Sequence, residues 1–137
     1  MDISLSHVDY RYQANTPFER LAIQDVSIDI PSGTYTAIIG HTGSGKSTVL
    51  QHLNALLKPT KGTVFIGNRE IKAGRKEKNL KGIREKVGIV FQFPEHQLFE
   101  ETVEKDICFG PLNFGVSETE AKKRANEAIK QVGLSEE

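Results

Sequence analysis

Apolar and polar side chains alternate along two stretches near the N-terminus, at residues 3–12 and 21–30. A period of two residues is typical of strands with one buried face, so both stretches are predicted strands. The second stretch ends at Pro31-Ser32-Gly33, which is a turn sequence. The short run that follows, residues 34–39, is rich in apolar side chains and predicts a buried strand.

A hairpin is predicted in the middle of the chain, where strands at residues 63–66 and 69–71 flank Gly67-Asn68. Glycine in the first position suits a two-residue turn, because the tight turns of hairpins need a positive φ there. Residues 87–91 form one more short apolar run, and they predict a further strand.

Three helices are predicted, the first and the last of them from apolar side chains on one face. Residues 46–57 carry valine and leucine at intervals of three and four, so one face of that helix is apolar. A helix of one or two turns is expected at residues 102–109, ended by Gly110-Pro111. The last helix is expected to begin after Ser117, because Glu120 stands three residues later, the spacing of a capping box, and it is expected to end at Gly133. Strands and helices together predict a mixed α/β fold.

Between the run at 34–39 and the first helix lies Gly40-His41-Thr42-Gly43-Ser44-Gly45-Lys46-Ser47. This sequence matches G-x-x-x-x-G-K-[ST], the phosphate-binding loop (P-loop, Walker A motif), at every fixed position. The alternative is a chance match in a glycine-rich turn. A preceding apolar strand and a following amphipathic helix are the context that the motif requires, and both are predicted here.

Each fixed position of the motif has a chemical reason. Gly40, Gly43 and Gly45 let the chain wrap closely, so that backbone N–H groups, including that of His41, converge on phosphate oxygens. Lys46 supplies a positive charge to the β- and γ-phosphates of ATP. The predicted ATP site therefore comprises the residues from Gly40 to Thr48, namely Gly40, His41, Thr42, Gly43, Ser44, Gly45, Lys46, Ser47 and Thr48. Ser47 would bind Mg²⁺ through its hydroxyl oxygen, and Thr48 would hydrogen-bond the α-phosphate.

The composition narrows the class of protein. Eighteen basic and eighteen acidic side chains cancel, which argues against a nucleic-acid binder. A single cysteine allows no internal disulfide, and no stretch approaches the roughly 20 apolar residues of a membrane span. The N-terminus lacks the basic start and apolar core of a signal peptide. We therefore expect a cytoplasmic protein whose membrane role, if it has one, comes through a partner.

The sequence around the loop resembles the nucleotide-binding domain of ABC transporters over essentially the whole chain. The segments that carry this resemblance are residues 21–33, 35–40, 56–62 and 87–92. Within that family, residues 91–100, 102–103 and 106–111 resemble the ATPases of energy-coupling factor (ECF) transporters, and Gly40-His41-Thr42-Gly43 resembles the second of their two ATPase subtypes. The resemblance implies a P-loop NTPase core with an antiparallel β-subdomain.

The resemblance also implies partners and a location. ECF importers take up vitamins, or cobalt and nickel ions, and two ATPases pair in them as a homo- or heterodimer. The pair drives a transmembrane coupling protein and a substrate-binding membrane component, so the expected location is the cytoplasmic face of the membrane. Residues 94–114 would form part of the groove that receives the coupling protein's helices. Leu98, Phe99 and Phe114 are candidate docking residues or, alternatively, core residues.

Two further site residues are implied by the resemblance. Tyr12 matches the aromatic residue that stacks on adenine, although Tyr12 or its neighbour Tyr10 can also be read as an ordinary strand residue. Gln92 matches the glutamine that contacts Mg²⁺ and the attacking water, and the alternative is a surface glutamine in a loop. Lys46 and Gln92 are therefore the expected catalytic residues, and Ser47 and Gln92 the expected metal ligands.

Three ABC motifs do not occur in this sequence: the Leu-Ser-Gly-Gly-Gln signature, a Walker B strand ending in Asp-Glu, and a switch histidine. Leu134-Ser135 is followed by Glu136-Glu137 and is not the signature. We therefore expect residues 1–137 to be the N-terminal part of a nucleotide-binding domain, which binds ATP with little or no hydrolysis, while the parent protein is a transport ATPase. The alternatives are a P-loop kinase and a regulatory nucleotide-binding module.

Overall fold

The computed structural model describes residues 1–134, so Ser135, Glu136 and Glu137 of the sequence analysis lie outside the described residues. The chain divides into two compact units. The first, Met1–Ile89, is called here the sheet unit, and the second, which begins at Val90, the helical unit.

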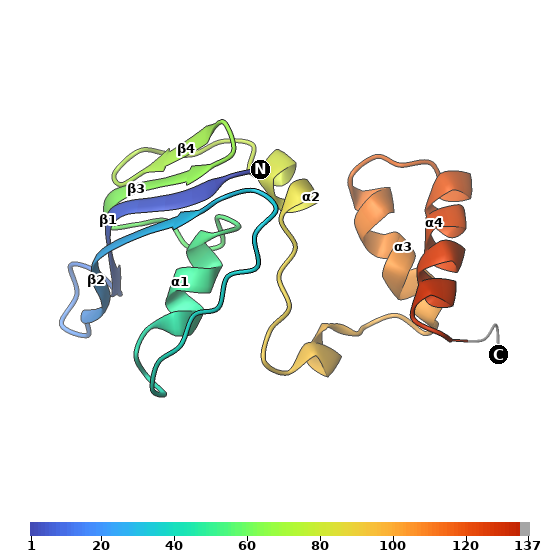
Figure 1. Cartoon of the computed structure of the whole chain (residues 1–137), viewed down its shortest axis with the longest axis horizontal. Helices are drawn as coiled ribbons and strands as arrows, with labels where there is room; N and C mark the ends of the chain where they lie inside the picture. Colours follow the sequence, from blue (N-terminus) through green and yellow to red (C-terminus); the bar gives the residue numbers. More distant parts are fainter. Residues whose placement is uncertain (135–137) are drawn as a thin grey trace. The chain divides into compact units, whose positions relative to one another are not determined.

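The sheet unit is built on four antiparallel strands in the order β2-β1-β3-β4 (Figure 1). The strands are β1 (Ile3–Tyr12), β2 (Arg20–Ile30), β3 (Lys61–Ile66) and β4 (Arg69–Lys72). All four were predicted from alternation and from the hairpin turn, and the antiparallel β-subdomain is confirmed. β1 lies inside the sheet between β2 and β3, and residues of β1, β3 and β4 on one face of the sheet are buried.

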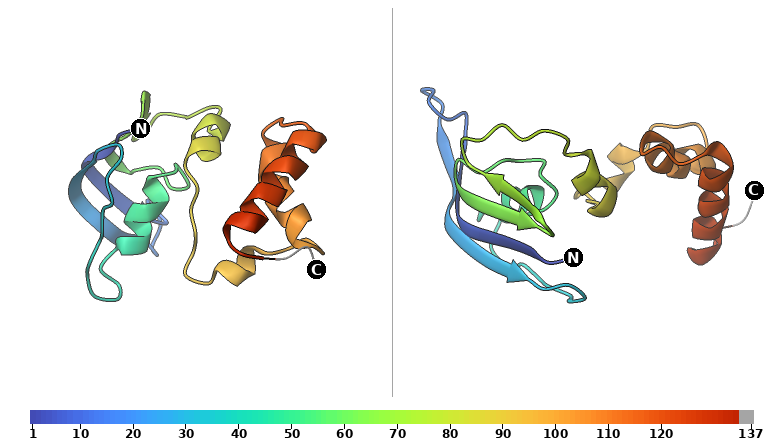
Figure 2. Two further views of the ribbon diagram at one scale, coloured as in Figure 1. Left: turned by 45° about the vertical axis from the view of Figure 1, so that its right-hand side comes forward. Right: turned by 90° about the horizontal axis from the view of Figure 1, so that it is seen from above.

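Alternating residues of the strands face a core that α1 (Lys46–His52) covers (Figure 2). Leu5, Val8 and Val64 are almost fully buried there, and Val49 of α1 packs into the same core. A short helix that the sequence did not predict, α2 (Lys81–Lys86), adds Ile83 to it. The core therefore holds α1, and with it the segment that precedes α1, against the sheet.

The prediction that the first helix continues to residue 57 was wrong, because α1 ends at His52. Ala55 adopts a positive φ of 61°, which a right-handed helix does not allow. The side chain of Asn54 accepts a hydrogen bond from the N–H of Leu56 at 3.2 Å. Asparagine competes with helical bonding in this way, so the chain leaves the helix while its leucines stay near the core.

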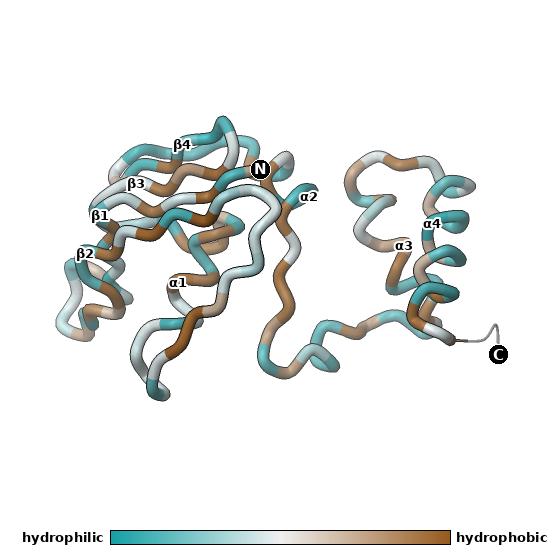
Figure 3. The backbone as a smooth tube through the Cα atoms, in the orientation of Figure 1, coloured by the Kyte–Doolittle hydropathy of each residue, from teal (hydrophilic) through white to brown (hydrophobic). Residues whose placement is uncertain are grey.

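Residues 34–39 and 87–91, which were predicted as strands, do not form strands in the structure. Both segments lack a paired neighbouring strand among residues 1–134, and a strand exists only where its N–H and C=O groups find such a neighbour. Tyr35, Ile39 and Val90 are exposed instead of buried. Figure 3 shows apolar colour on the backbone just before the loop and again after α2.

The helical unit contains a 3-10 turn (Pro94–Gln97), α3 (Val103–Asn113) and α4 (Glu118–Gln131). The predicted cap of the last helix is confirmed, since the Ser117 hydroxyl accepts the N–H of Glu120 at 3.3 Å. The predicted stop at Gly110-Pro111 was wrong. Pro111 removes only its own N–H, and Phe114 still donates to the carbonyl of Gly110 at 3.1 Å.

No helix within residues 1–134 is long and apolar enough to cross a membrane.

Candidate phosphate-binding loop

Residues 40–47 connect the extended segment 34–39 to the first turn of α1, which is where the sequence placed the loop. Gly43 and Gly45 both have a positive φ, 81° and 99°. The N–H of Ser44 donates to the carbonyl of His41 at 3.1 Å and closes a tight turn. Alternation of left- and right-handed residues turns successive N–H groups toward one side, a backbone geometry that holds anions.

Little space surrounds two of the glycines, and Gly45 is the more restricted of them. A Cβ on Gly45 would lie 2.8 Å from Cγ2 of Ile23 and 3.0 Å from the carbonyl oxygen of Ala22, both on β2. A Cβ on Gly40 would lie 2.7 Å from the hydroxyl of Ser44, which is the end of a flexible side chain and can move aside. The loop thus packs against the sheet at one end and on itself at the other, which fixes its shape in advance of any ligand.

Lys46 folds back over the loop. Its ammonium donates to the carbonyls of Gly40 at 2.5 Å and His41 at 2.7 Å, and it lies 3.3 Å from the Ser44 hydroxyl. The positive charge therefore sits directly beside the tight turn at residues 41–44. An anion on this loop would meet both the backbone donors and a charge-assisted lysine bond.

The other predicted site residues of the loop differ in their exposure to solvent. His41, Thr42 and Ser47 are exposed, so the Ser47 hydroxyl is open to a ligand or a metal ion. Thr48 is buried, and its hydroxyl lies 3.1 Å from the phenol oxygen of Tyr12. Among residues 1–134 no three acidic, histidine or cysteine side chains gather into a metal site. A hard cation at this loop would be held by the Ser47 hydroxyl and by phosphate oxygens of a bound nucleotide, as Mg²⁺ commonly is in phosphate-binding sites.

The structure brings together two predicted site residues that lie 36 positions apart, Tyr12 at the end of β1 and Thr48 on α1. Tyr12 is 39% exposed, so part of its surface is open to solvent. Its ring also meets Tyr10 edge to face, with ring centroids 4.8 Å apart. An aromatic face beside an anion-binding loop suits a ligand that carries both a planar base and phosphates.

The sequence analysis missed His52 as part of this neighbourhood. Its ring is 1% exposed, packs edge to face on Tyr10 at 5.2 Å and lies 2.7 Å from the Thr48 carbonyl. Burial lowers the pKa of His52, an effect that the bond to Thr48 partly offsets. The spacing of four from Thr48 on one helix was the available signal.

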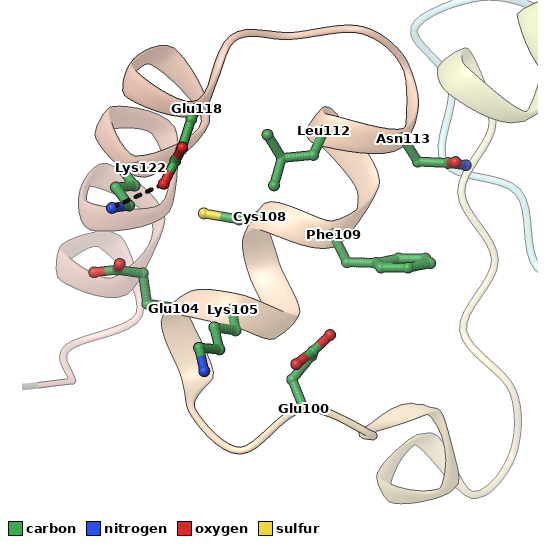
Figure 4. Close-up of a pocket in the computed structure, with 9 residues that line it drawn as sticks. All are labelled: Glu100, Glu104, Lys105, Cys108, Phe109, Leu112, Asn113, Glu118 and Lys122. Atoms are coloured by element: carbon green, nitrogen blue, oxygen red, sulfur yellow. Dashed lines mark ion pairs between the residues drawn. The ribbon is translucent and has the colours of Figure 1, made fainter.

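Gln92 lies in the helical unit and is exposed, and its predicted role stays a prediction. The helical unit also has an open cavity of about 610 Å³ between α3 and α4 (Figure 4). Cys108, Phe109 and Leu112 give it an apolar floor, and the ion pair of Glu118 with Lys122, at 3.2 Å, lies on its rim. Such a mixture suits a helix or loop of another protein better than a small charged ligand.

The chain is similar to known proteins over its whole length. It is 69% identical over 137 residues to the energy-coupling factor transporter ATP-binding protein EcfA2 of Bacillus thuringiensis (strain Al Hakam). It is 66% identical to the protein of the same name in Listeria monocytogenes (serotype 4b, strain F2365). Both matches cover 100% of this chain but 47% and 48% of the relatives, so the chain spans about half their length.

Solved structures agree with these relatives. A dimeric ATP-binding cassette in a post-hydrolysis state, bound to ADP and phosphate, matches 98% of this chain with a TM-score of 0.80 and 31% identity, over 58% of its own length. The protein cbiO1 of Clostridium perfringens, part of the ABC transporter complex cbiONQ, matches 97% of this chain with a TM-score of 0.76 and 36% identity, over 51% of its own length. These similarities do not favour a kinase.

The family model described as ABC transporter matches residues 23–137, which include the loop, Thr48, His52 and Gln92. The antiparallel sheet, the loop with its positive-φ glycines and the helix behind it are the parts of that fold that the structure describes. The chain belongs to the ABC transporter family.

Proposed function

We propose that this chain binds ATP with Mg²⁺ at residues 40–48, and that it acts as part of the ATP-binding subunit of an ECF-type importer. The observation that carries the proposal is the loop itself. Gly43 and Gly45 have a positive φ, Gly45 packs against β2, and Lys46 lies over the loop. The high identity to ATP-binding proteins of energy-coupling factor transporters supports the same assignment.

Different residues would bind the phosphates, the Mg²⁺ ion and the adenine. Backbone N–H groups of the loop and the Lys46 ammonium would hold the β- and γ-phosphates, after Lys46 exchanges its loop carbonyls for phosphate oxygens. Ser47, which is exposed, would contribute a hydroxyl oxygen to Mg²⁺. Tyr12, which is partly exposed, would stack on the adenine through its ring. Bound Mg²⁺ would neutralise phosphate charge, and Gln92 is proposed as its second protein ligand.

In the longer protein, this site would couple ATP binding and hydrolysis to the uptake of vitamins or metal ions. The proposed partners are a second ATPase subunit, a transmembrane coupling protein and a substrate-binding membrane component, at the cytoplasmic face of the membrane. Leu98 and Phe99 are more than half exposed, which supports a docking surface for helices of the coupling protein on the helical unit. By itself, this chain would bind ATP with little turnover.

Calorimetric titration of ATP with Mg²⁺ into the chain tests the proposal. Saturable binding is expected, and Lys46→Ala should weaken it at least tenfold, which is about 1.4 kcal/mol. Lys86→Ala is the matched control, because it removes the same charge from an exposed position at the end of α2 and should leave the affinity unchanged. A folded chain that does not bind ATP, or that binds equally well without the Lys46 ammonium, would contradict the proposed site.

A further inference from the structure

Four side chains of the sheet unit form one connected group, called here the tyrosine–histidine cluster: Tyr10, Tyr12, Thr48 and His52. Each of the four residues contacts two of the others, so the contacts form a closed circuit. Tyr12 bonds the Thr48 hydroxyl at 3.1 Å, His52 lies 2.7 Å from the Thr48 carbonyl, and Tyr10 packs edge to face on both His52 and Tyr12. Thr48 is therefore held from two sides, through its hydroxyl and through its backbone.

His52 is the buried end of this cluster, with 1% of its surface exposed. A carbonyl oxygen only accepts hydrogen bonds, so the Nδ1 atom that faces Thr48 carries the ring hydrogen. The other nitrogen, Nε2, is buried and has no hydrogen-bond partner among the described residues. A buried polar atom without a partner costs about 1–3 kcal/mol, which an aliphatic side chain of similar volume would avoid.

The chemistry of the cluster explains why a histidine rather than a leucine fits this place. The Nδ1–H bond fixes the plane of the ring, and the ring edge then fixes Tyr10 at 78° to it. Tyr10 in turn sets Tyr12 at 85° to itself. Burial and the neighbouring Tyr12 raise the pKa of Tyr10, so that ring stays neutral, as apolar packing requires.

We infer that His52 is a positioning residue of the nucleotide site, which orients Tyr12 toward the base without touching the nucleotide itself. The inference rests on the proposed function, since it assigns the Tyr12 face to a base. Its distinctive consequence is selectivity for one part of the ligand: loss of His52 affects the contact with the base, whereas the loop that holds the phosphates keeps its own supports from β2.

The test compares two ligands, ATP and inorganic triphosphate, each with Mg²⁺, in calorimetric titrations of the chain. His52→Leu removes the Nδ1 donor and keeps an apolar side chain, and it should weaken ATP about fivefold with triphosphate unchanged, because base stacking on an aromatic contributes about 1–3 kcal/mol. His52→Asn keeps an N–H donor near the Thr48 carbonyl but has no ring to pack on Tyr10, so it should weaken ATP about as much as His52→Leu, again with triphosphate unchanged.

Tyr10→Leu is the second variant, and it tests the same link without altering the helix. It should weaken ATP binding and leave triphosphate binding unchanged, as His52→Leu does. If circular dichroism shows that His52→Leu does not fold, Tyr10→Leu alone tests the inference. Unchanged ATP affinity in the folded variants would overturn the inference, and so would an equal loss for ATP and triphosphate. If the unaltered chain binds neither ligand, the proposed function itself fails, and the inference fails with it.

Discussion

Gly45 lies where the loop enters α1, and its φ of 99° is one that residues with a Cβ rarely adopt. The space around it is equally restrictive, because Ile23 and Ala22 of β2 lie where a Cβ would be. A single position thus links three things: the direction of the loop backbone, the packing of the loop on the sheet and the first turn of the helix. A change here should act on binding through geometry alone, with no change of charge.

Gly45→Ala should weaken ATP with Mg²⁺ by at least tenfold, because the strained φ costs about 1–2 kcal/mol and the clash with β2 adds to it. Calorimetry measures the loss. Gly82→Ala is the control, since that glycine lies on α2 without a positive φ, and a methyl group added there would meet only open space. It should keep the affinity and add up to about 1 kcal/mol of stability. Similar affinities for the two variants would contradict this account of Gly45.

His52 gives the sheet unit a pH dependence whose sign follows from burial. Because burial lowers its pKa, the unfolded chain takes up a proton on this ring at a pH where the folded chain does not. Its contribution to stability is complete above the ordinary histidine pKa of about 6.5, and it is lost as the pH falls through the folded pKa. The free energy of unfolding, from urea denaturation followed by circular dichroism, should fall on acidification below about pH 6.5. His52→Leu should lose this part of the decrease, and an unchanged pH profile would contradict the assignment.

At the scale of elements, the helices of the helical unit begin with side-chain caps. Thr102 accepts the N–H of Lys105 at 3.2 Å at the start of α3, and Ser117 does the same for Glu120 at the start of α4. Two small alanines, Ala121 and Ala125, form the buried contact of α4 with Cys108 of α3. Because so little apolar area is buried between the two helices, the caps should account for a large share of their stability.

Ser117→Ala should therefore lower the stability of the helical unit by about 1 kcal/mol. Thr119→Ala is the matched control, because Thr119 is exposed inside the same first turn and alanine is the better helix former. Thermal unfolding followed by helical circular dichroism should show a lower midpoint for the first variant only. Equal midpoints would mean that α4 does not depend on its cap.

Sequence patterns over a few neighbouring residues predicted the strands of the sheet and the phosphate-binding loop. Alternation located β1 and β2, a glycine turn located β3 and β4, and glycine spacing located the loop. The segments 34–39 and 87–91 could not be judged in this way, because an apolar run indicates a preference for burial, whereas a strand also needs a hydrogen-bonded neighbour. The contact of Tyr12 with Thr48 joins residues 36 positions apart. The loop motif suggested Thr48 as a site residue and the family resemblance suggested Tyr12, whereas periodicity suggested neither.

At the scale of the whole molecule, the two units have separate cores. The sheet unit is built around Val8, Val64 and Ile71, each at most 2% exposed, and the helical unit around the alanines of α4. The loop, Tyr12 and His52 all belong to the sheet unit. Stability and nucleotide binding in that unit should therefore respond together, while the helical unit responds to its own substitutions.

Val64→Ala should lower the stability of the sheet unit by roughly 1–3 kcal/mol, because it removes buried methyl groups from the centre of the sheet. Hydrogen exchange should accelerate at the amides of β1 and β3 and stay unchanged in α3 and α4. Ser117→Ala provides the reciprocal experiment, with faster exchange confined to α4. Acceleration of both units by either variant would show that the chain unfolds as one cooperative body.

The arrangement of Tyr10 and Tyr12 has an optical consequence. The chain has no tryptophan and three tyrosines, so its ultraviolet emission comes from phenol rings alone. Two of the three emitters stand in the tyrosine–histidine cluster, and the third, Tyr35, is fully exposed. A purine stacked on Tyr12 would quench that ring, and Tyr35→Phe would remove the unresponsive background. Nucleotide binding could then be followed as a decrease in the intrinsic tyrosine fluorescence of the protein, with no attached dye.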